Sequence, residues 1–158
     1  MARALGVSVQ SVPTYDGNRG LLVPLRDGAY RIIVRATETH GAQRFTVAHE
    51  LVELGLQVGC PALVERSYHD PGAGRAKERY CEVGAAEILM PLVWVRQEYW
   101  SRGAGIATLM ELSMIFGTSL HAMLRRIVEA SSVPCAGLIL YDCGCTTPSQ
   151  GGPGVLWT

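Results

Sequence analysis

The 158-residue sequence has no excess of either charge. Fourteen Lys and Arg residues balance fourteen Asp and Glu residues, so the formal net charge at pH 7 is zero. No overall positive field exists to attract nucleic acid or a membrane surface. The sequence also lacks an apolar run of about 18 residues, which a membrane-spanning helix needs. Residues 1–6 lack the long apolar core of a signal peptide. We therefore expect a cytoplasmic protein that binds neither membranes nor nucleic acid directly.

Cysteine is sparse, and its number is odd. The five cysteines of a chain without a secretion signal are expected to remain reduced thiols. Cys143 and Cys145, separated by one glycine, could supply two thiolates to a zinc ion. Because no second matched pair of cysteines accompanies them, plain thiols near the C-terminus are the alternative.

The rest of the composition is that of an ordinary globular protein. Hydrophobic residues make up 48% of the chain and charged residues 18%, and this length can bury a core of its own. We expect one domain over residues 1–145. Residues 146–158, rich in Pro, Gly and Ser, are expected to form an irregular tail.

Local patterns predict three strands, then five helices and one late strand, which indicates an α+β fold. Pro24 places its strand at a sheet edge. Gly and Pro residues indicate a mobile loop over residues 59–74. Gly117 caps the end of one later helix, and Thr118 or Ser119 caps the start of the next. The expected strands are 7–12, 21–25, 30–35 and 133–141, and the expected helices are 43–59, 75–90, 92–100, 106–116 and 119–130.

The first predicted helix carries the residues on which a functional interpretation depends. His49 and Glu53 are four residues apart, so their side chains project from the same face and can reach one point. Glu50 is turned by about 100° and approaches that point from the side. This spacing is that of a metal-binding helix with an adjacent general base, normally His-Glu-x-x-His, with Glu53 in place of the second His.

The bland interpretation is that these are surface carboxylates beside a satisfied histidine. Against it, Glu50 and Glu53 lie among apolar residues, and carboxylates are rarely buried unless they are paired or bind a metal. The next helix contains a further carboxylate pair at positions i and i+4, Glu78 and Glu82.

Three blocks of the sequence, residues 44–51, 85–91 and 116–126, resemble signatures of the ImmA/IrrE family of metallopeptidases and occur in the family's order. The likeness covers about residues 20 to 130. It implies a minimal zincin-like fold, in which a small N-terminal antiparallel sheet packs on a helical bundle that carries the active-site helix.

The resemblance also implies roles for individual residues. His49, Glu53 and Glu78 would be the metal ligands, and Glu50 the general base that activates a metal-bound water. Glu82 would orient the ligands. His69, in the predicted loop, could supply an extra ligand or an oxyanion donor; an exposed loop histidine is the alternative.

Glu53 alters the expected chemistry of the site. Glu is an accepted zinc ligand, but two carboxylates cancel the charge of a divalent ion and favour harder ions such as Mn²⁺. Zn²⁺, Mn²⁺ and a site without metal all remain open. Without metal, only His49 and Arg79 would offset the carboxylates, so at least one should hold a proton.

Two functions follow from these expectations. The first is a metal-dependent endopeptidase acting on a protein, which by resemblance is a helix-turn-helix repressor that controls a stress, phage or mobile-element programme. The second is a catalytically degenerate peptidase fold that serves as a regulatory or protein-binding module. A DNA-binding role for residues 106–130 is disfavoured by the charge balance. The oligomeric state has no signature in the sequence.

Overall fold

The computed structural model describes residues 2–13, 20–132, 134–140 and 154–156. The chain divides into two compact units, residues 1–91 and residues 92–158. The single domain predicted over residues 1–145 stays a prediction.

The first unit begins with a short 3-10 helix, η1 (Ala2–Leu5), and a three-stranded sheet of β1 (Val7–Val12), β2 (Gly20–Pro24) and β3 (Tyr30–Arg35). The strand order is β1-β3-β2, so β2 is an edge strand, as Pro24 indicated. β3 runs antiparallel to β2 but parallel to β1. The prediction of an antiparallel sheet was therefore wrong for β1. The chain reverses its direction between β1 and β2 and again between β2 and β3, so β3 runs in the same direction as β1. Because β1 pairs with β3 and not with β2, that pair is parallel.

Three helices complete this unit: α1 (His40–Gly59), α2 (Pro61–Ser67) and α3 (Pro71–Leu89). Thr39 caps α1, accepting a hydrogen bond from the Ala42 backbone N–H at 3.3 Å, so the helix starts three residues earlier than predicted. The mobile loop predicted over residues 59–74 was wrong. Its prolines, Pro61 and Pro71, start α2 and α3, where the missing N–H of proline has no partner to lose.

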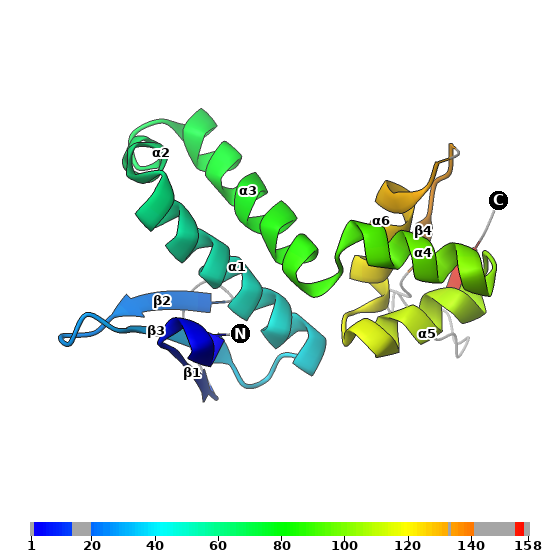
Figure 1. The fold of residues 1–158 in the computed structure, drawn as a ribbon, viewed down its shortest axis with the longest axis horizontal. Helices are drawn as coiled ribbons and strands as arrows, with labels where there is room; N and C mark the ends of the chain where they lie inside the picture. The colour runs from blue at the N-terminus through cyan, green and yellow to red at the C-terminus, as the bar shows by residue number, and fades with distance from the viewer. Residues whose placement is uncertain (1, 14–19, 133, 141–153, 157–158) are drawn as a thin grey trace, which may run out of the picture. The chain divides into compact units, whose positions relative to one another are not determined.

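α1 lies between the sheet and α3 (Figure 1). On its sheet side, Leu51 packs into a buried cluster with Val7, Ile32 and Val34. Burial of these apolar side chains holds the helix on the sheet. The face of α1 that bears His49 is thereby placed between β2 and α3.

The contact between α1 and α3 depends on a residue without a side chain. A Cβ atom at Gly84 of α3 would lie only 2.7 and 2.8 Å from the two Cγ atoms of Val52 on α1. Val52 is β-branched and has little freedom to move aside. Glycine at position 84 therefore allows the two helices to approach.

We expect Gly84→Ala to lower the free energy of unfolding by about 1–3 kcal/mol through overpacking. In a Val52→Ala background the same change should stabilise the protein, because the clash is gone and Ala is favoured over Gly in a helix by about 1 kcal/mol. Urea denaturation of the two single variants and the double variant measures both effects. Equal effects of Gly84→Ala in both backgrounds would contradict this account.

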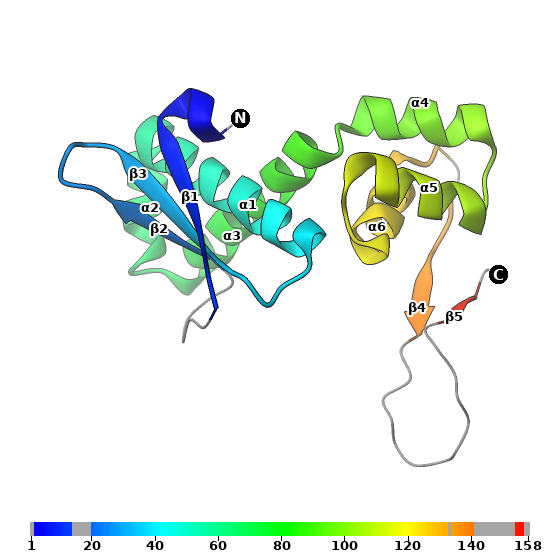
Figure 2. The same cartoon turned by 90° about the horizontal axis from the view of Figure 1, so that it is seen from below.

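The second unit contains α4 (Leu92–Arg102), α5 (Ile106–Phe116), α6 (Leu120–Ala130) and two short antiparallel strands, β4 (Leu138–Leu140) and β5 (Gly154–Leu156), seen in Figure 2. The predicted caps are confirmed: Gly117 adopts φ 61° after α5, and Ser119 accepts a hydrogen bond from the Ala122 N–H. β5 lies in the segment predicted to be irregular. Cys143, Cys145 and residues 146–153 lie outside the described residues.

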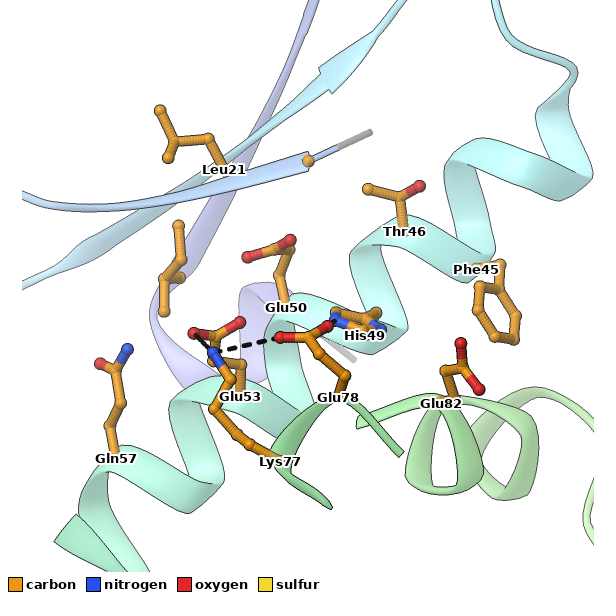
Figure 3. A pocket seen from close by; sticks show the side chains of 12 residues that line it. Leu21, Phe45, Thr46, His49, Glu50, Glu53, Gln57, Lys77, Glu78 and Glu82 are labelled. Atoms are coloured by element: carbon orange, nitrogen blue, oxygen red, sulfur yellow. Dashed lines mark hydrogen bonds and ion pairs between the residues drawn. The ribbon is translucent and has the colours of Figure 1, made fainter. Parts of the chain in front are cut away.

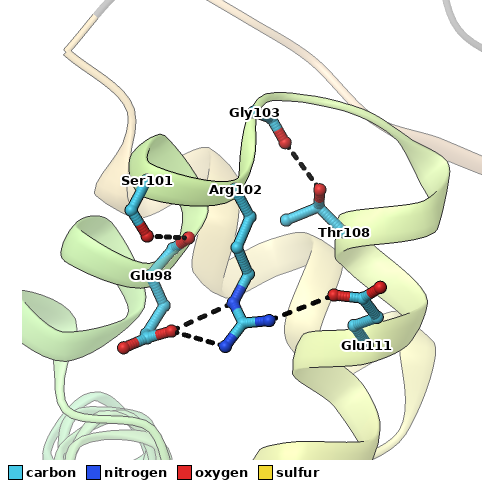
Figure 4. A network of polar contacts seen from close by, with 6 residues as sticks. All are labelled: Glu98, Ser101, Arg102, Gly103, Thr108 and Glu111. Carbon is cyan, nitrogen blue, oxygen red and sulfur yellow. Dashed lines mark hydrogen bonds and ion pairs between the residues drawn. The ribbon is translucent and has the colours of Figure 1, made fainter.

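Side chains from all three helices form the interior of this unit, and an ion-pair network joins α4 to α5. Arg102 binds Glu98 at 2.9 Å and Glu111 at 3.2 Å (Figure 4). The Thr108 hydroxyl donates to the Gly103 carbonyl at 2.6 Å, which ties the start of α5 to the end of α4. The least exposed interior residues are Val95, Leu109, Leu112, Met123 and Ile127.

Within the described ranges, no single helix has both the length and the apolar character needed to cross a membrane. Two bent helix pairs, α1 with α2 (112°) and α5 with α6 (110°), meet these criteria only when each pair is counted together.

Candidate functional site

A cavity of about 650 Å³ opens in the first unit between β2, α1 and α3. Five carboxyl or imidazole side chains named from the sequence line it, and Figure 3 shows how they are placed. Three of them come from α1 and two from α3, and β2 lines the opposite side of the cavity with Gly20, Leu21 and Leu22. The five side chains are His49, Glu50, Glu53, Glu78 and Glu82.

Glu50 is the buried acid of the site. Its residue exposure is 8%, and its carboxyl group lies beside β2, where the Leu22 backbone N–H donates a hydrogen bond to it. A Cβ at Gly20 would clash with Thr46 and would lie 2.8 Å from Glu50 Oε1, so β2 approaches α1 closely because position 20 is glycine. Burial, and then the negative charges of Glu53 and Glu78, raise the pKa of Glu50 from 4.5 to about 7.

Such a group can take up and release a proton at neutral pH. A general acid or base works best when its pKa lies near the operating pH. The sequence predicts that at least one carboxylate of the cluster holds a proton, and Glu50 is the residue with the raised pKa.

A lysine bridges two of the other carboxylates. Lys77 Nζ lies 2.8 Å from Glu53 Oε1 and 3.3 Å from Glu78 Oε1, and the side chain is only 12% exposed. Glu78 also reaches α1, with its Oε2 3.4 Å from His49 Nε2. Burial by itself lowers the pKa of Lys77, but the hydrogen bonds and charges of Glu53 and Glu78 outweigh it and raise that pKa above its ordinary value.

The residues present fit a divalent metal ion. Ligand atoms of His49, Glu53 and Cys81 lie within 4.8 Å of one another, close enough to share one ion, and all three residue types bind zinc. Burial, and then the charges of Glu53 and Glu78, raise the pKa of the Cys81 thiol to about 11, so Cys81 must lose a proton before it can bind metal. The Glu78 carboxyl group offers a further ligand at the same place, because its Oε2 lies 3.4 Å from His49 Nε2.

Sequence reasoning missed Lys77 and Cys81. It assigned the positive charge to Arg79, which is exposed and does not line the cavity. Lys77 and Cys81 are four residues apart on α3 and so share a face of that helix. This spacing could have indicated that both side chains point to the same place.

His69 is not brought to the cavity. It lies exposed in the turn between α2 and α3 and is not a lining residue. The segment that was expected to fold over the site as a loop is largely helical, so the structure gives no support to a role for His69 as ligand or oxyanion donor.

The fold and the cavity define a class: a small α+β protein of the zincin-like metallopeptidase type. The chain belongs to the family described as the IrrE N-terminal-like domain, peptidase family M78, whose model matches residues 2–128. The match covers both compact units in part.

A solved structure titled Mycobacterium tuberculosis transcriptional regulator has a similar fold, with a TM-score of 0.57 and 17% sequence identity. The alignment covers 81% of this chain but only 38% of that one, so this chain spans well under half of the other's length. At this identity the likeness shows the fold alone. No curated protein matches this chain.

Proposed function

We propose that this protein is a metal-dependent endopeptidase acting on a protein substrate in the cytoplasm. The observation that carries the proposal is the position of Glu50: a buried carboxyl group in the same cavity as ligand atoms of His49, Glu53 and Cys81 that lie within 4.8 Å of one another. Membership of a peptidase family supports it.

His49 and Glu53 would hold the metal, with Glu78 as the third ligand and Cys81 as the competing one. Glu82 lines the same cavity and helps to hold the ligands in place. When bound, the ion supplies Lewis-acid chemistry at the peptide carbonyl. Imidazole and thiol donors favour Zn²⁺, while a site of His49 and two carboxylates is also suited to Mn²⁺.

Glu50 then performs the proton transfers. As a carboxylate it takes a proton from the attacking water, and as a carboxylic acid it returns that proton to the leaving amine. The hydrogen bond from the Leu22 N–H orients this buried carboxyl group.

An extended peptide segment can dock on β2. This is an edge strand, and its residues Gly20, Leu21 and Leu22 line the cavity. Backbone hydrogen bonds to a sheet edge give affinity for extended peptides without demanding one sequence. The family resemblance makes a helix-turn-helix repressor of a stress response the substrate we propose.

A second function is favoured by one contact. The ion pair between Lys77 and Glu53 offsets the carboxylates within the protein itself. A peptidase fold with such an internal cation could serve as a protein-binding module without hydrolysis.

Metal binding separates the two functions. We expect purified protein equilibrated with Zn²⁺ or Mn²⁺ to retain about one ion per chain, as a single site of this type does, and His49→Ala to abolish retention. Elemental analysis after gel filtration measures the ratio. His121→Ala, a change of the same type on α6 and outside the cavity, is the matched control and should retain the ion. If the unaltered protein retains no ion, the peptidase is excluded and the module is favoured.

A further inference from the structure

Lys77 is the only lysine in the chain, against thirteen arginines. Its side chain is largely buried, whereas lysine side chains generally extend into water. An ammonium group is a compact point charge with three donors, while a guanidinium is a broad planar fork. The single lysine therefore places a compact cation between the Glu53 and Glu78 carboxylates.

The ammonium group stands between two of the proposed metal ligands. It contacts Glu53 Oε1 at 2.8 Å and Glu78 Oε1 at 3.3 Å, as the dashed lines in Figure 3 show. A metal ion bound to the same two carboxylates would lie about 2.0–2.2 Å from their oxygens. Two cations drawn to the same two carboxylates repel each other in a partly buried site.

We propose that Lys77 is an intramolecular competitor of the metal: its ammonium group neutralises Glu53 and Glu78 in the metal-free protein and is displaced when a divalent ion binds. This inference rests on the proposed metal site and adds its regulation. The ion pair with Glu53 links α3 to α1 without metal. Both ion pairs raise the metal concentration at which the site fills.

The first test is metal affinity in the full chain. We expect the dissociation constants for Zn²⁺ and for Mn²⁺ to fall about tenfold or more in Lys77→Met, because charge-assisted hydrogen bonds no longer have to be broken. Arg79→Met is the matched control: it removes the same charge from an exposed position of α3. Its affinity should stay within about twofold, since exposed charges are screened by solvent and salt. His49→Ala gives the background from other thiols and imidazoles.

A second measurement uses the unaltered protein and does not depend on whether a variant folds. Labelling with ¹⁵N-lysine gives a single side-chain Nζ signal, because the chain has one lysine. We expect the ion-paired ammonium signal of Lys77 to be visible in the metal-free protein and to be lost or shifted when Zn²⁺ saturates the site. A signal that stays unchanged at saturation would overturn the proposal.

The outcomes distinguish this inference from the proposed function. If the unaltered protein binds metal and Lys77→Met binds it no more tightly, or more weakly, the competition is refuted and the metal site stands. If only Lys77→Met binds metal, the competition is supported and the native metal-dependent peptidase is refuted. If neither binds, both are refuted.

Discussion

Glu50→Gln is expected to lower the rate of peptide hydrolysis by about 10²- to 10⁴-fold, the usual contribution of a general acid–base group. Glutamine has nearly the same shape and can still accept the hydrogen bond from the Leu22 N–H, so the fold and the metal ligands should remain in place. Metal retention should therefore be unchanged, which separates the loss of proton transfer from the loss of the ion.

The measurement is cleavage of a peptide library in the presence of Zn²⁺ or Mn²⁺, with new N-termini counted by mass spectrometry. Glu65→Gln makes the same chemical change on the exposed surface of α2 and serves as the control. Hydrolysis that survives in Glu50→Gln would show that another group is the base. Hydrolysis that is lost equally in Glu65→Gln would point to a general effect on stability.

The metal-free protein is expected to lose stability as the pH rises through neutrality. Burial and the neighbouring charges of Glu53 and Glu78 raise the pKa of Glu50 from 4.5 to about 7, so the folded protein holds this proton more tightly than the unfolded chain does. The stabilising contribution of the protonated form is fully present below a pH of about 4.5 and is lost as the pH rises through about 7. The difference between these pKa values corresponds to about 3 kcal/mol.

Urea denaturation in EDTA at about pH 5 and about pH 8 measures this change, and Glu50→Gln should show little of it, since Gln does not titrate. Parallel pH dependence in the unaltered protein and in Glu50→Gln would mean that Glu50 ionises freely in the folded state. The site would then lack a proton acceptor tuned to neutral pH.

Spacing along one helix was enough to predict much of the site. His49, Glu50 and Glu53 are held together by helical periodicity, and they line one cavity with Glu78 and Glu82. Their roles as base and ligands remain proposals. The α+β class and the family were also accessible, because sequence blocks such as residues 44–51 are local.

Other features could not be predicted from local pattern. The prolines at positions 61 and 71 indicate a loop when read alone, yet each starts a helix. Proline is compatible both with a loop and with the first turn of a helix, so the residue type does not distinguish the two. The direction of β1 depends on which strand becomes its neighbour, and that pairing joins residues more than twenty positions apart.

The sequence by itself determined that one helix presents an imidazole and two carboxylates on adjoining faces, since 3.6 residues per turn leave little choice. Only the tertiary structure decided that Glu50 is buried against β2 and that Lys77 and Cys81 enter the site from α3. The physical reason is that these positions depend on how closely two elements approach. The distance between the elements depends on two non-local contacts, Gly20 with Thr46 and Gly84 with Val52. In each contact the glycine has no side chain to hold the elements apart.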